Sequence, residues 1–313
     1  MAVERISLDR EIEMLFMSMI GRPTYFHDVV GNYFNCVGMD ARLGSCIKSI
    51  STIYNSCLGE TSKRPDWSDI IYRRAYMYRF FMMHSYVVYR GLQKALVHHS
   101  CITERWKQKD HLRACCIGGG PGSDVVGLVN FLQENSLFPV SFLQCTIFDR
   151  HPEWKNEWKM VQKANQVRLP MDVTYLPCNM TMKGGCLCRA GLTAVQSADI
   201  ITVIKSFSTI AAFMRKDAAH GNLLRKMFRE MKPGALVLYI DNRYNDQHEE
   251  FRKIAQSGGV RECLYEWHGT VKMTPPMLAT QQESVNRISR TIGLDPMTTC
   301  KVSILLLRKA TEF

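Results

Sequence analysis

The sequence lacks an apolar run long enough to cross a lipid bilayer. Its longest apolar stretch, Phe80–Tyr89, contains His84 and Ser85, whereas a membrane-spanning helix needs roughly 18 or more apolar residues in succession. The opening residues, MAVERISLDREIEM, carry charges where a secretion signal has its apolar core. We therefore expect a protein without a membrane span, located in the cytoplasm or the nucleus.

The sequence also lacks a block of positive charge. It has 40 Lys and Arg against 29 Asp and Glu, a net charge of +11, but the excess is spread along the chain. The densest basic stretch is Arg215–Lys232. Nucleic-acid-binding modules gather their basic residues on one face or stripe. The charge thus leaves RNA open as a partner without arguing for it.

The 12 cysteines lack the arrangement of a disulfide scaffold or a zinc site. Disulfide scaffolds are short and secreted, and this chain has 313 residues. Cys186 and Cys188, with Cys178 nearby, form the densest group. Structural zinc sites use two Cys or Cys/His pairs, and no second pair follows. We predict reduced thiols and no metal.

The chain changes character near residue 110. Before it, the patterns are helical, and residues 1–105 are predicted to form a helical cap that carries the substrate region. Helices are expected over residues 8–20, 41–58 and 68–98, and the last of them could bend at Gly91. It is so rich in aromatic residues that we expect it to be enclosed on several sides.

One face of this last helix is a candidate for substrate contacts. Tyr72, Tyr76, Arg79, Met83 and Tyr86 recur at spacings of four and three, which would place them on one side of a regular helix. Aromatic residues at such spacings are more often core than pocket. Both interpretations stay open at this point.

After residue 110, strand and helix patterns alternate. Apolar runs predict strands over residues 113–118, 143–149, 172–178, 198–205 and 235–241. Helical patterns separate them over residues 123–135, 153–166 and 210–231. Strands separated by helices predict a parallel sheet in an α/β fold. Two last runs, residues 261–273 and 300–308, predict an antiparallel pair with an insertion between its strands.

A glycine loop follows the first strand and opens the next helix. It reads Gly118-Gly119-Gly120-Pro121-Gly122-Ser123. Glycines let backbone approach a ligand where a Cβ would clash, and a helix N-terminus offers free N–H groups to an anion. The loop lacks the Gly-Lys-Ser/Thr of a phosphate-binding loop, and the dinucleotide fingerprint would need a glycine in place of Ser123. Its Gly-x-Gly-x-Gly pattern suits S-adenosylmethionine, although a plain glycine-rich turn is the alternative.

An acidic residue ends the second predicted strand. Asp149 stands in TIFDRHPEW, 29 positions after Gly120. A carboxylate at this place accepts hydrogen bonds from ribose hydroxyls in wound α/β sheets. Capping of the following helix is the alternative role.

Together these residues resemble the class I, Rossmann-like S-adenosylmethionine-dependent methyltransferases, over about residues 106–313. The resemblance implies a seven-stranded sheet with an antiparallel terminal hairpin, S-adenosylmethionine as cofactor, and a methyltransferase domain over residues 106–313. It also implies a set of cofactor-binding residues: Gly118, Gly119, Gly120, Pro121, Gly122, Ser123, Asp149, Arg150, Asn179, Met180, Lys205, Ser206 and Phe207. Asn179 stands where the family more often has Asp, and Met231–Ala235 is similar to the family's Lys-Pro-Gly turn.

Three residues are candidates for a catalytic role. Lys205 follows the fourth strand and could pair with a substrate carboxylate or phosphate, or face solvent. Asp241 follows the fifth strand and could be a base or a cap. His268 lies in the terminal hairpin and could be a base or a structural imidazole. The fourth strand lacks the Asn/Asp-Pro-Pro-Tyr motif of methylases that act on adenine or glutamine amino groups.

The sequence thus predicts an enzyme that moves a methyl group to an N, O or S nucleophile of a small molecule, an RNA or a protein. Such an enzyme needs no fixed catalytic residue, because the cofactor carries an activated methyl group. A non-catalytic S-adenosylmethionine-binding sensor or scaffold would keep the same motifs. An RNA-binding module with a degenerate cofactor site is a third interpretation.

Overall fold

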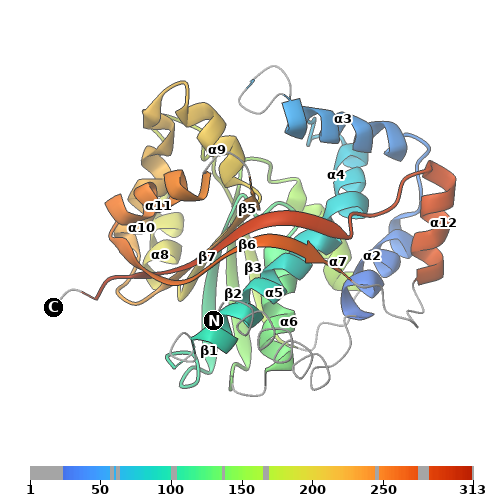
Figure 1. The fold of residues 1–313 in the computed structure, drawn as a ribbon. Helices are drawn as coiled ribbons and strands as arrows, with labels where there is room; N and C mark the ends of the chain where they lie inside the picture. The colour runs from blue at the N-terminus through green and yellow to red at the C-terminus, as the bar shows by residue number, and fades with distance from the viewer. Residues whose placement is uncertain are drawn as a thin grey trace, which may run out of the picture.

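Seven strands of the described chain form one sheet. The computed structural model describes residues 24–56, 60, 64–99, 104–135, 138–164, 169–243, 247–273 and 282–311, so the helix predicted over residues 8–20 lies outside them. The strand order is β3-β2-β1-β4-β5-β7-β6 (Figure 1). The strands are β1 His111–Ile117, β2 Phe142–Asp149, β3 Met171–Pro177, β4 Ile200–Ile204, β5 Leu236–Asn242, β6 Val260–Lys272 and β7 Thr299–Lys309.

The strand directions match the predicted class. Strands β1 to β5 pair in parallel, whereas β7 is antiparallel to both β5 and β6. The chain thus has an α/β fold whose seven-stranded, mostly parallel sheet ends in an antiparallel hairpin, as the sequence predicted. Its order reverses between β1 and β4, and in wound sheets ligands bind at the carboxyl ends of strands at such a point.

Apolar residues fill the central strands because helices cover both faces of the sheet. All five residues of β4, IITVI, are buried. The edge strand β6 instead has exposed residues along much of its length. The difference follows from position, since an edge strand has one neighbour and more contact with water.

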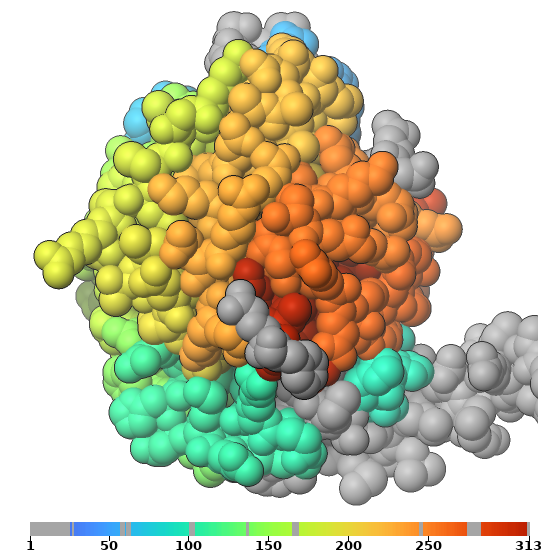
Figure 2. Space-filling model, turned by 90° about the vertical axis from the view of Figure 1, so that its left-hand side faces the viewer, coloured from blue at the N-terminus to red at the C-terminus, as the bar shows by residue number. Residues whose placement is uncertain are grey.

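One face of the sheet carries helices from the second half of the chain. They are α8 Arg189–Ser197, α9 Phe207–Met214, a 3-10 turn Ala218–Gly221, α10 Asn222–Glu230 and α11 Gln247–Ser257. Their apolar side chains and those of the sheet form one core, in which Tyr239 stacks on Phe251 with ring centroids 4.3 Å apart. Figure 2 shows this layer from outside, in yellow to orange.

The other face carries helices that come mostly from before β1. They are α2 Thr24–Val37, α3 Leu43–Ser56, α4 Ile70–Tyr76, α5 Met82–His98, α6 Ser123–Glu134, α7 Trp154–Ala164 and α12 Gln282–Ile292. A single apolar cluster runs from α2 and α3 through α5 to the sheet. Helix α5 lies against β5 and β7, where a Cβ on Gly91 would be 3.2 Å from Ile240 Cδ1. None of the described helices is both long and apolar enough to cross a bilayer.

The helix predicted over residues 68–98 is interrupted at a different place from the one expected. Residues Met77–Phe81 form a π-helical turn between α4 and α5, whereas α5 continues as an α-helix through Gly91. A π turn adds a residue to the helical repeat, so side chains before and after it lose their common face. Residues 81–89 are all buried, which confirms that this helix is enclosed on several sides.

Three further helical segments depart from the sequence prediction. Helix α2 was not predicted. The helix predicted over residues 210–231 is divided into α9, a 3-10 turn and α10, because the Asp217 side chain accepts a hydrogen bond from Ala219 N and begins a new turn. The predicted insertion in the terminal hairpin contains α12. It packs beside α2 (Figure 1), and Ser289 Oγ lies 2.7 Å from Tyr78 Oη.

Candidate functional site

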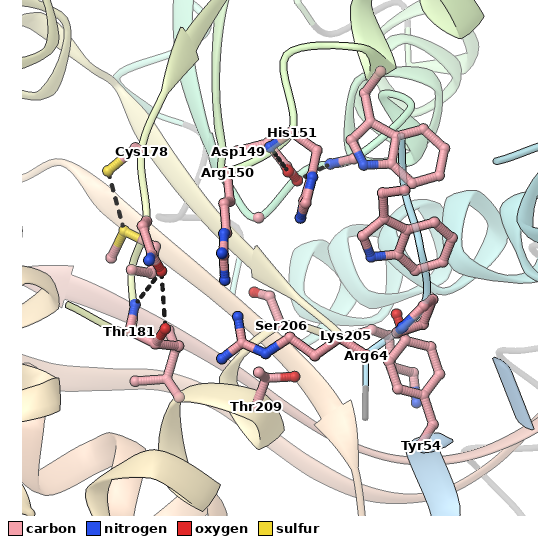
Figure 3. Close-up of a pocket in the computed structure, with 18 of the residues that line it drawn as sticks. Tyr54, Arg64, Asp149, Arg150, His151, Cys178, Thr181, Lys205, Ser206 and Thr209 are labelled. Carbon is pink, nitrogen blue, oxygen red and sulfur yellow. Dashed lines mark hydrogen bonds between the residues drawn. The ribbon is translucent and has the colours of Figure 1, made fainter. Parts of the chain in front are cut away.

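A pocket opens at the carboxyl ends of β1, β2, β3 and β4, where the strand order reverses (Figure 3). The sheet side supplies its floor, and the segment before β1 supplies the facing wall. The residues that line it are Ile53, Tyr54, Glu60, Arg64, Pro65, Trp67, Tyr76, Gly118, Gly120, Asp149, Arg150, His151, Trp154, Cys178, Asn179, Met180, Thr181, Ile204, Lys205, Ser206, Thr209, Ile210 and Phe213.

The glycine loop reaches this pocket through Gly118 and Gly120. Both have positive φ, 64° and 47°, a conformation that glycine adopts without steric cost. A Cβ on Gly118 would lie 2.7 Å from Ser206 Cβ, so this glycine is needed for close packing of β1 against β4. A Cβ on Gly120 would have Trp154 as its only close neighbour, at 3.8 Å. Gly120 therefore leaves its space to the pocket.

The other predicted loop residues do not line the pocket. Gly119 and Gly122 face packed side chains, because a Cβ on each would lie within 2.8 Å of Cys116 Cβ and 2.6 Å of Trp158 Cε3, respectively. Ser123 opens α6 and is buried. For these residues and for Pro121, a direct cofactor contact stays a prediction.

A buried carboxyl group lies at the start of α6. Asp124 is 2% exposed, and its Oδ2 accepts a hydrogen bond from Thr202 Oγ1 at 2.6 Å. Burial raises the pKa of Asp124 to about 7, although the hydrogen bonds from Thr202 and Ser123 act in the opposite direction. This contact ties the first turn of α6 to β4. Sequence reasoning did not single out Asp124, which reads as an ordinary acidic residue in a helix's first turn.

Asp149 joins the end of β2 to the glycine loop. Its Oδ2 accepts a hydrogen bond from Gly120 N at 3.0 Å, and its Oδ1 accepts one from His151 N at 2.9 Å. Burial raises the pKa of Asp149 to about 6, while these amide hydrogen bonds lower it. The carboxyl group is therefore mainly ionised at pH 7. It lines the pocket as an anchored negative charge.

Two positive side chains enter the pocket. Figure 3 shows the Arg64 and Arg150 side chains extending into the pocket. The Arg64 guanidinium lies over the Phe213 ring of α9, with 4.7 Å from Cζ to the ring centroid. Burial lowers the pKa of Arg64, and the nearby charge of Arg150 lowers it further. Burial likewise lowers the pKa of His151, again with a contribution from Arg150.

The segment after β3 forms the pocket wall next to Asp149. Asn179 Oδ1 accepts hydrogen bonds from Thr181 N at 3.1 Å and Thr181 Oγ1 at 2.8 Å. The oxygen that was expected to meet an adenine amino group thus holds the turn, and that contact stays a prediction. Met180 is buried, and Cys178 Sγ lies 3.6 Å from Met180 Sδ.

The end of β4 is held in an unusual conformation. Lys205 has φ 54° and is the one described non-glycine residue with positive φ, and such strain clusters at functional sites. Its Nζ donates hydrogen bonds to Asn242 Oδ1 at 2.6 Å and Cys300 Sγ at 3.0 Å. Ser206 Oγ donates to Ile117 O at 2.8 Å. Both residues line the pocket, but Lys205 already directs its charge toward β5 and β7.

Phe207 and two of the candidate catalytic residues do not line the pocket. Phe207 is fully buried in the core that contains Tyr239. Asp241 is also fully buried, and it accepts hydrogen bonds from Ser208 N and Asn242 N, each at 2.7 Å. It therefore caps α9, and burial raises its pKa.

His268 is likewise held by neighbours on the sheet. Its Nδ1 lies 2.8 Å from Ser303 Oγ, and its Nε2 lies 2.9 Å from Glu266 Oε1. In the described part of the chain, one group of side chains could hold a metal ion, and it consists of His248, Glu266 and His268. Glu266 already pairs with Arg252 at 2.6 Å, and this cation opposes a metal at the same carboxylate.

Aromatic side chains build the wall opposite the sheet, and the sequence did not identify most of them. Trp67, Tyr76 and Trp154 meet pairwise with ring centroids 5.0 to 5.6 Å apart. The Tyr76 hydroxyl is 2.8 Å from Nδ1 of His84. Burial holds the pKa of His84 well below its usual value and that of Tyr76 well above, so both stay neutral.

The predicted common face of the long helix is not kept. Tyr76 lines the pocket, whereas Met83 and Tyr86 are buried in the core beyond the π turn. Tyr72 also packs against that core, and Arg79 binds Asp295 O on the segment that follows α12. The substrate-contact interpretation thus holds as a candidate for Tyr76 alone among the five. The inserted π residue, which periodicity does not reveal, explains why Met83 and Tyr86 do not share the face of Tyr76.

Comparisons with known proteins give likenesses of fold only. No family model matches the chain, and no curated protein matches it. A proposed RNA methyltransferase from Pyrococcus horikoshii matches with TM-score 0.41 and 13% identity, over 75% of this chain and 88% of that one. A proposed class I S-adenosylmethionine-dependent methyltransferase from Listeria monocytogenes gives TM-score 0.38 and 12% identity, over 92% and 88%. The [4+2]-cyclase SpnF gives 0.37 and 12%, over 74% and 94%. Likenesses of this degree assign no activity.

Proposed function

We propose that this chain binds S-adenosylmethionine in the pocket at the carboxyl edge of the sheet and transfers its methyl group to an acceptor. One observation carries the proposal. The Asp149 carboxylate at the end of β2 is hydrogen-bonded to Gly120 N of the glycine loop, and both residues line the pocket. A carboxylate beside a glycine-rich loop at the switch point is the arrangement that binds the ribose of a nucleoside in wound sheets.

The residues present fit such a cofactor. Asp149 is ionised at neutral pH and would accept hydrogen bonds from both ribose hydroxyls. Gly120 leaves room for the amino-acid part beside the start of α6, where the helix offers partial positive charge. Asn179 and Met180 lie after β3, where the resemblance implies the adenine.

The bound cofactor would supply an activated methyl group on its sulfonium. The chain would then orient the acceptor and exclude water, since in-line placement of the reacting atoms provides much of the rate. The aromatic wall of Trp67, Tyr76 and Trp154 closes the pocket opposite the sheet. Asp241 and His268 do not line it, so we assign them no proton transfer. In this proposal the transfer depends on in-line positioning of the acceptor's nucleophile and uses no base from these two residues.

A labelling experiment tests the proposal. The protein is incubated with methyl-labelled S-adenosylmethionine and a fractionated cell extract, and label is measured in RNA, protein and small molecules. We expect transfer by the wild type and none by Gly120→Val, whose side chain would occupy the pocket. Gly184→Val is the matched control, because a Cβ there meets nothing within 4 Å.

The outcomes separate the alternatives. Cofactor binding without transfer to any fraction would contradict an enzyme and favour a sensor or scaffold. If the wild type neither binds the cofactor nor transfers a methyl group, an RNA-binding module with a degenerate cofactor site is favoured. If Gly120→Val unfolds, Asp149→Ala serves as the second inactive variant.

A further inference from the structure

Two arginines, Arg64 and Arg150, extend into the pocket. Arg64 and Arg150 both line it, and neither makes an ion pair with a carboxylate among the residues that the structure describes. Figure 3 shows the two side chains entering the same space from different sides. Like charges repel, and a partly desolvated guanidinium is costly without a counter-charge. A ligand with a negative charge would offset the cost of placing these two guanidinium groups together.

The surroundings of Arg64 place it on the acceptor side of the pocket. Its guanidinium stacks on Phe213 of α9, the helix that follows β4. Thr209 of the same helix lines the pocket near it (Figure 3). The glycine loop and Asp149, which would hold the cofactor's ribose and amino-acid part, lie at the ends of β1 and β2.

Positive side chains outnumber acidic ones in the pocket lining, where Asp149 and Glu60 lie with Arg64, Arg150 and Lys205. Asp149 accepts hydrogen bonds from the amides of Gly120 and His151. Lys205 adds a further positive charge at the end of β4, and it donates hydrogen bonds to Asn242 Oδ1 and Cys300 Sγ. Guanidinium groups bind carboxylate and phosphate oxygens in a bidentate manner.

Resting on the proposed function, we propose that the methyl acceptor is a small anionic molecule whose carboxylate or phosphate group is bound between Arg64 and Arg150. Arg64, from the segment before β1, and Arg150, from the end of β2, would both bind this anionic group. The aromatic rings of Trp67 and Tyr76 would cover the rest of the acceptor. Anion recognition would thus select the substrate, while Asp149 and the glycine loop bind the cofactor.

The test is a calorimetric titration at constant ionic strength, with the protein saturated by S-adenosylhomocysteine. The probes are inorganic phosphate and benzoate, which carry the two anion chemistries separately. We expect at least one probe to bind the wild type. We expect Arg64→Gln and Arg150→Gln each to weaken it about ten- to hundredfold, as loss of a charged hydrogen bond does. Arg64→Lys should retain part of the affinity. Arg229→Gln, an exposed arginine on α10, is the matched control.

Three results would overturn the proposal, and a fourth would overturn the proposed function instead. If the wild type binds S-adenosylhomocysteine but neither anion, the acceptor is not selected by charge. If the Gln variants lose S-adenosylhomocysteine yet bind 5′-methylthioadenosine normally, the arginines hold the cofactor's own carboxylate. If RNA oligonucleotides compete and the small anions do not, the acceptor is a polynucleotide. Failure of the wild type to bind S-adenosylhomocysteine at all would instead remove the proposed function.

Discussion

Three buried or partly buried carboxyl groups lie near the carboxyl edge of the sheet, and each has a different partner. Asp124 accepts a hydrogen bond from a hydroxyl, Asp241 from an amide at the start of α9, and Asp149 from the glycine loop. Only Asp149 also lines the pocket. At the residue scale, Asp149 is therefore the one of these three carboxylates that is placed to contact a ligand in the pocket.

Asp124 gives a prediction about pH. Its pKa is raised to about 7 in the folded chain, so the folded state holds this proton more tightly than the unfolded state does. Stability is lost as pH rises from about 4 to about 7. Asp124→Asn removes the titration, so its stability relative to wild type should rise by about 2–3 kcal/mol between pH 5 and pH 8.

Chemical denaturation of both proteins at the two pH values measures this difference. Asp172→Asn, at an exposed position on β3, controls for the loss of one surface charge. An Asp124→Asn effect that is the same at pH 5 and pH 8 would show that the carboxyl group is not titrating in this range.

At the scale of elements, a buried ion pair joins the helices that carry the aromatic wall. Arg73 Nε of α4 donates to Glu157 Oε1 of α7 at 2.9 Å, and Tyr33 of α2 donates to the other oxygen of Glu157. Arg73 Nη1 also donates to Trp67 O at 2.7 Å and Ser68 O at 2.9 Å. The same arginine thus positions the backbone of a pocket residue.

This network predicts a large loss of stability on removing one partner. Glu157→Gln should lower the free energy of unfolding by about 3–5 kcal/mol, because it leaves the Arg73 charge buried without a counter-charge. Glu104→Gln breaks the exposed pair with Lys107 and should cost at most about 1 kcal/mol. Denaturant titration compares the two. Equal effects would contradict the role given to burial.

How far the sequence could predict these elements depends on the kind of interaction that forms them. Strands were predictable because continuous apolar runs such as Ile200–Ile204 follow from burial on both faces. The π turn at Met77–Phe81 was not, because one inserted residue leaves composition unchanged and is fixed by packing between helices. Arg64 and Trp67 were missed as pocket residues since they precede the sheet by more than 40 positions, and only the folded chain brings them to Asp149.

At the scale of the whole molecule, the pocket belongs to two parts of the chain. The sheet supplies the glycine loop, Asp149 and the ends of β3 and β4, whereas the segment before β1 supplies Arg64, Trp67 and Tyr76. A shared apolar cluster connects those helices to the sheet. The net charge of +11 is spread over the chain, and two of its positive groups, Arg64 and Arg150, line this pocket.

The central claim is that Asp149 and the glycine loop bind S-adenosylmethionine. A calorimetric titration of S-adenosylhomocysteine into wild type, Asp149→Asn and Asp172→Asn tests it most directly. We predict saturable binding by wild type and Asp172→Asn. Asp149→Asn should bind about 10- to 100-fold more weakly, because hydrogen bonds from ribose hydroxyls to an ionised carboxylate are lost. No binding by the wild type, or equal affinity in Asp149→Asn, would contradict the claim.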